Sequence, residues 1–366
     1  MLHITGIIIS LFLSILLFTK KGKSGADLLL AFWLLLISLH LVTYYLLATG
    51  KFIEFPYLLG VEIAFPFIHG PFLYLYTSLL TGKKITNLKF GLHFIPTLLV
   101  YVVLLKFFLL PIAEKILVYE NQGAGYTTIL KIIHFAVIPS GVVYIVLSLL
   151  LLKEHRKIIS NQLSAVEKIN LNWLSKPMIG MGLIWLSVLF GNDRTTFTCV
   201  DLFILYIGYF GVKQVGIFTN KIDEQPLPHE EIAFPVKYQK SAIGEVLLSE
   251  IHAELLKLME QKKLFRDPEL SLNELAKQLC VHPNSLSQVI NTLEHKNFYD
   301  YINALRINEF KTIMLFPENQ KFTMLSLAYE VGFNSKTSFN RNFKKITGLS
   351  PTAYLKQHKI RLQVTI

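Results

Sequence analysis

Residues 324–345 read MLSLAYEVGFNSKTSFNRNFKK, and this stretch decides the fold of the C-terminal third of the chain. Met324–Val331 and Lys336–Lys345 both show apolar residues at helical spacing, and Gly332-Phe333-Asn334-Ser335 separate them. Glycine accepts the left-handed backbone that ends a helix, and serine caps the start of the next one. The stretch therefore predicts a helix-turn-helix, at about residues 324–345.

A second stretch with the same layout precedes it, at about residues 272–291. Leu272–Leu279 and Asn284–Asn291 are its helical parts, and Cys280-Val281-His282-Pro283 form its turn. Proline suits the first turn of a helix, where its missing N–H costs nothing. The C-terminal region is therefore predicted to hold two helix-turn-helix units in tandem.

The second helix of each unit has a register that can be predicted from its apolar spacing. Residues expected to pack inward are Leu286, Val289, Ile290, Phe339, Phe343 and Ile346. Polar residues left outward are Asn284, Ser287, Gln288 and Asn291, then Lys336, Thr337, Asn340, Arg341 and Lys344. Asn and Gln can pair with adenine, Arg with guanine, and Lys with guanine or phosphate. A solvated polar face is the plainer alternative, but two such helices in tandem favour DNA.

Charge placement agrees with a nucleic-acid partner. The whole chain has a formal net charge of +11, and from Val331 to the end it contains no Asp or Glu. The cations of that segment are Lys336, Arg341, Lys344, Lys345, Lys356, Lys359 and Arg361. A one-signed stretch that overlaps a recognition helix is typical of a phosphate-facing surface.

These residues also resemble a known family. Leu270–Tyr354 is similar to the DNA-binding domain of AraC/XylS-type bacterial regulators. The matching motifs are LNELA at 272–276, FYDYINALR at 298–306, AYEVGF at 328–333, SFNRNFKK at 338–345 and GLSPTAY at 348–354. The resemblance implies two helix-turn-helix units joined by a long helix, about 298–316, which stops before Pro317.

The resemblance also implies how DNA is bound. Both recognition helices would enter successive major grooves of double-stranded DNA, roughly 34 Å apart, and we expect a homodimer on DNA. The implied base contacts are Asn284, Ser287 and Gln288 in the first unit, and Lys336, Thr337, Asn340 and Arg341 in the second. One departure concerns the first unit: Gln288 stands where many members have a basic residue, and Ile290 where many have an aromatic one.

The N-terminal part has a different character. The chain is 52% hydrophobic, with a mean hydropathy of +0.46, and most of this apolarity lies in residues 1–218. A membrane span needs about 20 apolar residues. Seven runs qualify: 2–19, 28–48, 56–80, 91–110, 129–152, 177–190 and 197–218, of which the sixth is short. So many runs with so few charges disfavour the alternative of a large soluble helical core.

Lysine and arginine in the connecting loops set the expected orientation. Odd-numbered loops contain Lys20, Lys21, Lys23, Lys83, Lys84, Lys89, Lys153, Arg156, Lys157, Lys168 and Lys176. Even-numbered loops and adjoining span ends contain Lys51, Lys106, Lys115, Lys131 and Arg194. The bias predicts a multi-pass protein of the bacterial cytoplasmic membrane, with the N-terminus outside and the DNA-binding domain in the cytoplasm. If the sixth run did not cross, the C-terminal region would be exported.

Ionisable residues inside spans are expensive and therefore functional candidates. They are His40, Glu62, His69, His134 and Asp201. Glu62 and His69 are seven apart and would share a helix face; Pro66 leaves the Glu62 carbonyl without its helical partner, and Gly70-Pro71 loosens the next turn. A signal-sensing pocket open to the exterior is one hypothesis. Hydrogen bonding within the helical bundle is the alternative.

Together these patterns predict an all-α protein of three parts: a seven-helix membrane domain at 1–218, a proline-containing linker at 219–243 and an AraC-type domain at 244–366. No catalytic motif, cofactor site or metal site is expected, and Cys199 and Cys280 lack metal-ligand spacing. We expect a membrane-anchored transcription regulator, a one-component sensor of an unknown small-molecule or membrane signal. The alternatives are a transporter or membrane enzyme with a regulatory C-terminal domain, and a passive tether cut to release the factor.

Overall fold

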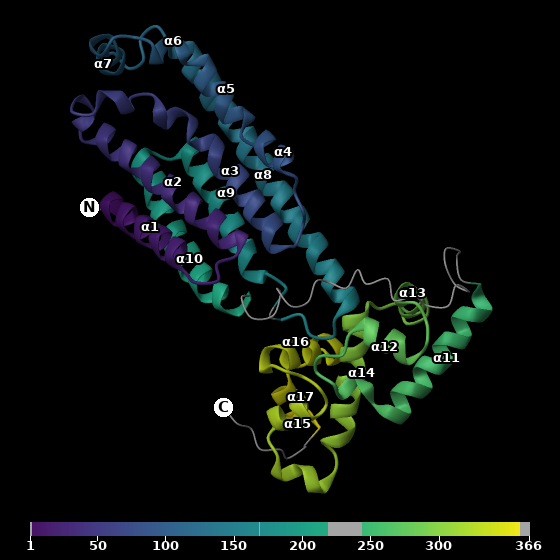
Figure 1. Cartoon of the computed structure of the whole chain (residues 1–366). Coiled ribbons are helices and arrows are strands. Elements are labelled where there is room, and N and C mark those ends of the chain that lie inside the picture. The colour runs from purple at the N-terminus through teal and green to yellow at the C-terminus, as the bar shows by residue number, and fades with distance from the viewer. Residues whose placement is uncertain (1, 168, 219–243, 359–366) are drawn as a thin grey trace. The chain divides into compact units, whose positions relative to one another are not determined.

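The computed structural model describes residues 2–167, 169–218 and 244–358, which fall into two compact units (Figure 1). The first unit contains the chain up to Glu154 and again from Leu171 to the end of the helix at Phe218. The second unit contains His155–Asn170 together with the helices that follow residue 244. The predicted linker at 219–243 and the cations Lys359 and Arg361 lie outside the described residues.

Within the described residues, the first unit contains ten α-helices. They are α1 (Leu2–Thr19), α2 (Gly25–Ala48), α3 (Pro66–Leu80), α4 (Asn87–Leu92), α5 (Ile95–Val103), α6 (Leu105–Phe108), α7 (Ile112–Glu120), α8 (Thr127–Gln162), α9 (Ser175–Phe190) and α10 (Asp193–Phe218). Five of the seven predicted runs therefore coincide with single helices: α1, α2, α8, α9 and α10. The α8 helix continues ten residues past the predicted run and its last turns belong to the second unit.

The third and fourth predicted runs are not continuous helices. In the third, the 3₁₀ turns Pro56–Leu58 and Val61–Ala64 precede α3 and meet it at a bend of 51°. Gly60 has a left-handed backbone (φ 89°), and Pro66 occupies the first turn of α3, so neither permits a helix through this point. Pro66 has no N–H to donate to the Glu62 carbonyl, and the amide of Phe65 donates to this carbonyl instead, at 3.2 Å. The fourth run divides into α4, α5 and α6.

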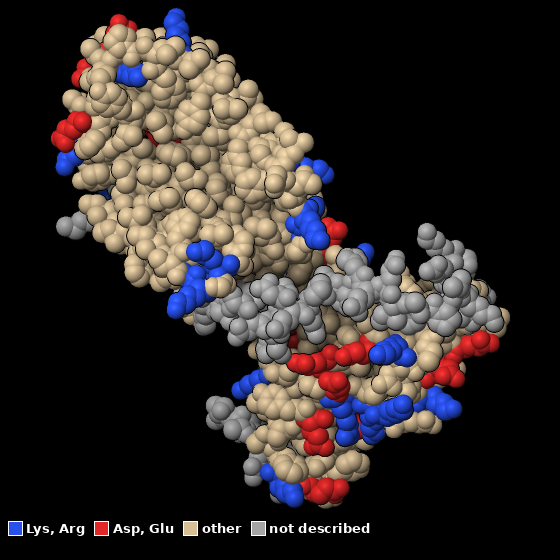
Figure 2. All heavy atoms as spheres, viewed as in Figure 1, with Lys and Arg blue, Asp and Glu red and all other residues tan. Residues whose placement is uncertain are grey.

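The first unit buries aromatic and aliphatic side chains inside and also presents large ones outside. Trp33, Leu34 and Leu73 are fully buried, whereas Phe135 and Phe190 are 74% and 84% exposed. On the face drawn in Figure 2 the charged side chains of this unit gather toward its ends, and the surface between them is largely uncharged. Apolar surface of this extent is typical of contact with lipid.

By length and composition, three helical segments of the described residues could cross a membrane, or four if the bent pair ending in α3 is one span. The three are α2, α8 and Asn172–Phe190, in which the 3₁₀ turn Asn172–Leu174 extends α9 to 19 residues. Ile4–Thr19 is a shorter apolar helix. The count of seven spans stays a prediction.

The second unit is also helical. Its elements after residue 244 are α11 (Glu245–Lys262), η6 (Leu264–Arg266), α12 (Leu272–Gln278), α13 (Pro283–Leu293), α14 (Phe298–Ile313), η7 (Pro317–Lys321), α15 (Met324–Glu330), α16 (Lys336–Thr347) and α17 (Pro351–Gln357). Across the described residues the only extended pairing is one isolated bridge, between Leu163 and Ser271. The all-α prediction is confirmed.

Both predicted turns form by the same backbone device. Cys280 and Gly332 have left-handed backbones, with φ of 53° and 99°, and each ends the first helix of its unit. The amide of the next residue then reaches back to the helix, from Val281 to the Ala276 carbonyl and from Phe333 to the Ala328 carbonyl, both at 3.0 Å. The predicted caps are confirmed as well, since Pro283 opens α13 and the Ser335 hydroxyl accepts from the Ser338 amide at 3.1 Å.

Helix α14 joins two hydrophobic cores. Its first half gives Phe298 and Ile302 to a core shared with α11, α12 and α13, and its second half gives Ile307 and Phe310 to a core shared with α15, α16 and α17. The inward prediction holds for Leu286, Val289, Ile290, Phe339 and Phe343, all at most 2% exposed. It is wrong for Ile346, which is 40% exposed because it lies near the end of α16, beyond the part that packs on α14.

We predict that Gly332→Ala loosens the second helix-turn-helix more than Gly348→Ala does. Both glycines have positive φ, but a Cβ at Gly332 would lie 2.6 Å from the Phe265 carbonyl oxygen, whereas nothing lies within 4 Å of one at Gly348. The backbone strain, about 1–2 kcal/mol, is common to both variants, and only the first adds a clash with main chain. Hydrogen exchange of peptides covering α15 and α16 measures the difference, and equal effects would contradict the packing argument.

Candidate functional site

The two recognition helices expose the polar faces that their sequences predict. On α13, Asn284 and Asn291 are exposed and Ser287 and Gln288 are partly exposed. On α16, all five predicted residues are exposed: Lys336, Thr337, Asn340, Arg341 and Lys344. The opposite side of each helix packs into one of the two cores that share α14. Because α14 belongs to both cores, this one helix connects the two recognition helices and their polar faces.

Arg341 differs from the other four residues on α16 because it already has polar partners. Its Nη2 lies 2.8 Å from the Glu167 carboxylate and 2.5 Å from the Tyr299 hydroxyl. Burial alone would lower the pKa of Arg341, but Tyr299 and Glu167 raise it above its ordinary value. The guanidinium is therefore a fixed cation at the edge of the α16 face, and its side chain is still 45% exposed.

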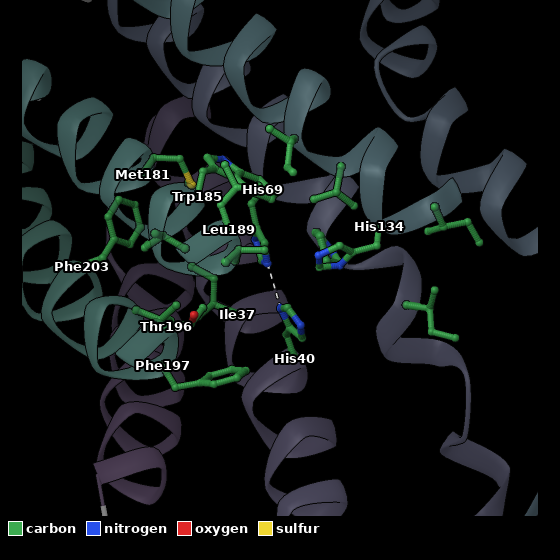
Figure 3. Close-up of a pocket in the computed structure, with 18 of the residues that line it drawn as sticks. Ile37, His40, His69, His134, Met181, Trp185, Leu189, Thr196, Phe197 and Phe203 are labelled. Atoms are coloured by element: carbon green, nitrogen blue, oxygen red, sulfur yellow. Dashed lines mark hydrogen bonds between the residues drawn. The ribbon is translucent and has the colours of Figure 1, made fainter. Parts of the chain in front are cut away.

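A cavity of about 760 Å³ in the first unit brings together three of the five predicted membrane residues (Figure 3). His40 on α2, His69 on α3 and His134 on α8 all line it. The rest of its wall is largely apolar: Trp33, Ile37, Met181, Trp185, Leu189, Phe197 and Phe203 are among the lining residues. A mostly apolar cavity with a few convergent polar groups is the usual form of a small-molecule site.

A chain of hydrogen bonds orients two of the histidines, His40 and His69. Trp33 Nε1 lies 3.2 Å from His69 Nδ1, and His69 Nε2 lies 3.0 Å from His40 Nδ1 (dashed in Figure 3). An indole N–H can only donate, so His69 accepts at Nδ1, carries its proton on Nε2 and donates to His40. His40 must then carry its own proton on Nε2, which has no hydrogen-bond partner among the described residues. This chain of hydrogen bonds therefore leaves the Nε2–H of His40 as a donor for an oxygen of a ligand.

Glu62 and Asp201, the other two predicted residues, do not line this cavity. Glu62 accepts a short hydrogen bond from the Tyr119 hydroxyl, which itself accepts from the Gly60 amide at 2.7 Å. Asp201 lies against α1, where a Cβ on Gly6 would touch its carboxylate. The bend before α3 separates Glu62 from His69, so the predicted shared helix face is wrong.

Several site residues were missed from the sequence. Trp33 and Trp185 resemble ordinary apolar span residues, and Tyr119 lies in α7, between two predicted spans, so none of them carries a local signal. Glu167 lies between two predicted spans, and nothing in the sequence around it marks it as a site residue. Among the residues that the structure describes, no group of three or more His, Cys, Asp or Glu side chains could hold a metal ion.

Comparison with known proteins assigns the C-terminal part of the chain. Residues 275–357 match a family model described as a helix-turn-helix domain. That range covers α13 to α17, most of α12 and therefore both recognition helices. The AraC-type resemblance is confirmed for this domain.

Two curated relatives match part of the chain. The Melibiose operon regulatory proteins of Escherichia coli strain K12 and of Escherichia coli O6:H1 strain CFT073 are each 28% identical over 97 residues, which are 26% of this chain and 31% of the relative. The chain thus spans about a third of the length of these relatives. No solved structure matches it.

Proposed function

We propose, from the AraC-type helix-turn-helix domain at residues 275–357, that this protein regulates transcription by binding specific DNA sequences while anchored in a bacterial cytoplasmic membrane. The observation that carries the proposal is the pair of exposed polar faces on α13 and α16, fixed to one helix. The two relatives are named as regulatory proteins of an operon. The apolar surface of the first unit supports the anchor.

Base contacts are proposed for the exposed polar residues. They are Asn284, Ser287, Gln288, Lys336, Thr337, Asn340, Arg341 and Lys344. Arg341 can pair with guanine, and Asn340 or Asn284 with adenine. Since α13 has no Lys or Arg on this face, α16 contributes the stronger base contacts. Two copies of the chain on one operator would double the number of recognition helices.

The contacts inside the second unit support the proposed orientation. His155–Asn170 and the helix-turn-helix helices fold together, so they must lie on the same side of any membrane. The chain between them contains α9 and α10, which together must therefore cross an even number of times. If α10 crosses, α9 must cross as well. The lysine-rich loop before α9 and the DNA-binding domain would then both be cytoplasmic.

For the sensor role we propose that the histidine cavity binds the signal. The cavity volume of about 760 Å³ suits a small molecule, and its apolar wall suits a hydrophobic one. The Nε2–H of His40 would donate to an oxygen at one end of that molecule, and Lys131, which also lines the cavity, could pair with an acidic group. The ligand class is therefore an amphiphile with an apolar body and a carboxylate end.

We predict that the full chain in lipid nanodiscs binds duplex DNA with affinity that falls steeply with salt. About six phosphate contacts would give roughly a thousandfold loss between about 50 and about 200 mM salt. Arg341→Ala should cost about 1–3 kcal/mol and relax the preference at one base pair. Lys356→Ala on α17 is the matched control, because it removes a cation that would contact phosphate and should weaken binding to all DNA sequences alike. Binding that ignores both salt and sequence would contradict the proposal.

Chemical labelling of the native Cys280 tests the proposed orientation in the membrane, and no new cysteine has to be introduced. It is exposed in the turn before α13, and we predict that a membrane-impermeant maleimide labels it in inside-out vesicles but not in intact spheroplasts. Cys280→Ser identifies the labelled site, since Cys199 is the other cysteine of the chain. Labelling of Cys280 from outside the cell would rule out a cytoplasmic DNA-binding domain.

Tryptophan fluorescence tests the cavity. A brominated long-chain carboxylic acid should quench Trp33 and Trp185 saturably, because both line the cavity, and leave Trp173 unaffected. His40→Leu should weaken this binding about three- to tenfold, the value of one hydrogen bond. His93→Leu is the control, since His93 bonds Tyr144 and does not line the cavity. Equal, unsaturable quenching in all variants would mean that the acid only dissolves in lipid.

A further inference from the structure

The segment between α8 and α9 is an integral part of the second unit. The Ser164 amide donates to the Leu270 carbonyl at 3.2 Å, and Leu163 pairs with Ser271 just before α12 begins. Ile159 and Val166 form a small apolar cluster with Tyr299 of α14. Backbone pairing and apolar burial together dock this segment on the rest of the second unit.

Arg306, at the middle of α14, holds the docked segment in place. It is 1% exposed, and its guanidinium donates to the Ser164 carbonyl and hydroxyl at 3.2 and 3.1 Å. The same group donates to the Phe265 and Asp267 carbonyls, both at 2.7 Å. Burial lowers the pKa of Arg306 to about 10, so it remains charged at neutral pH. A buried charge is costly unless it is fully hydrogen-bonded, so Ser164 is a needed partner.

Glu167, three residues further along, reaches the recognition helix. Its Oε1 accepts from the Tyr299 hydroxyl at 3.0 Å and from Arg341 Nη2 at 2.8 Å. The Glu167 side chain is only 15% exposed, and its Oε2 is buried with no partner among the described residues. Since a buried carboxylate is stabilised chiefly by its cation, Arg341 and Glu167 hold each other in this arrangement.

Bidentate pairing with guanine needs a free guanidinium edge. In the described arrangement Nη2 of Arg341 is taken by Glu167 and Tyr299, and DNA bound at α16 would also bring phosphates near the Glu167 carboxylate. We propose that residues 163–167 form a latch, which restrains Arg341 through Glu167 and must loosen for full DNA affinity. This inference rests on the proposed DNA-binding function and adds its regulation.

The latch is also placed to transmit a signal. The chain enters it from α8 and leaves it into α9, and these two helices contribute His134, Met181 and Trp185 to the histidine cavity. A ligand that changes the packing of α8 against α9 would act on the two ends of the latch through the chain itself. The interaction surface on the DNA-binding domain is Tyr299, Asn303, Arg306 and Arg341, and its partner is this chain's own loop.

The test compares DNA affinities of the full chain in nanodiscs, with a duplex recovered by selection from genomic DNA. Glu167→Gln keeps the size of the side chain and removes its charge, and should raise affinity about three- to tenfold. Glu154→Gln removes the same charge from an exposed position on α8 and should change affinity less than about twofold. In an Arg341→Ala background, Glu167→Gln should have a smaller effect, because the restraint on Arg341 is already gone and only the repulsion between Glu167 and phosphate is left to remove.

The outcomes separate the two proposals. If Glu167→Gln and Glu154→Gln behave alike while Arg341→Ala still weakens binding, the latch is wrong and DNA binding stands. If no variant and not even the wild type binds DNA at low salt, the proposed function fails and the latch fails with it. Hydrogen exchange gives a second readout: the Ser164 amide should be protected in the free protein and exchange faster once DNA is added. Unchanged protection would overturn the release of the latch.

Discussion

The buried guanidinium of Arg306 is the interaction on which the second unit depends. It lies on α14 between the two hydrophobic cores, and it gathers carbonyl groups from the residues around η6 and from the loop at Ser164. Because a charge buried without partners would be strongly destabilising, these segments must come together whenever the unit folds. The spacing of α13 and α16 follows, since both helices pack on the helix that Arg306 fixes.

Local chemistry explains why the two helix-turn-helix units could largely be predicted from the sequence. Gly332, Ser335 and Pro283 act through their own backbone or the next few residues, so their roles are visible in a short window of sequence. Apolar spacing likewise placed the inward faces of α13 and α16. It misplaced Ile346 because the contact surface of α14 ends before α16 does, and spacing alone contains no information on where a neighbouring helix ends.

The first unit could be predicted less well, for a related reason. Hydropathy locates apolar segments to within a few residues, as for α1 and α2, but it is insensitive to how the backbone bends inside them. Gly60 and Pro66 interrupt the third segment, and this changes which side chains meet: His69 joins His40 and Trp33, whereas Glu62 pairs with Tyr119. Convergence of the three histidines on one cavity depends on three different helices, α2, α3 and α8, and has no local signature.

The contact between Glu167 and Arg341 spans 174 residues of sequence and joins the loop before α9 to the second recognition helix. Charge bias alone suggests that the loop before α9 and the C-terminal domain lie on the same side of the membrane. Because His155–Asn170 folds together with that domain, the two must lie on the same side of any membrane, whatever the charges of the loops. If α10 crosses the membrane, the short helix α9 must cross it as well. An odd number of crossings would place Ser164 and Arg306 on opposite sides of the membrane, where they could not form their hydrogen bonds. The predicted crossing of α9, the shortest of the seven runs, is thus tied to the buried Arg306 of the second unit.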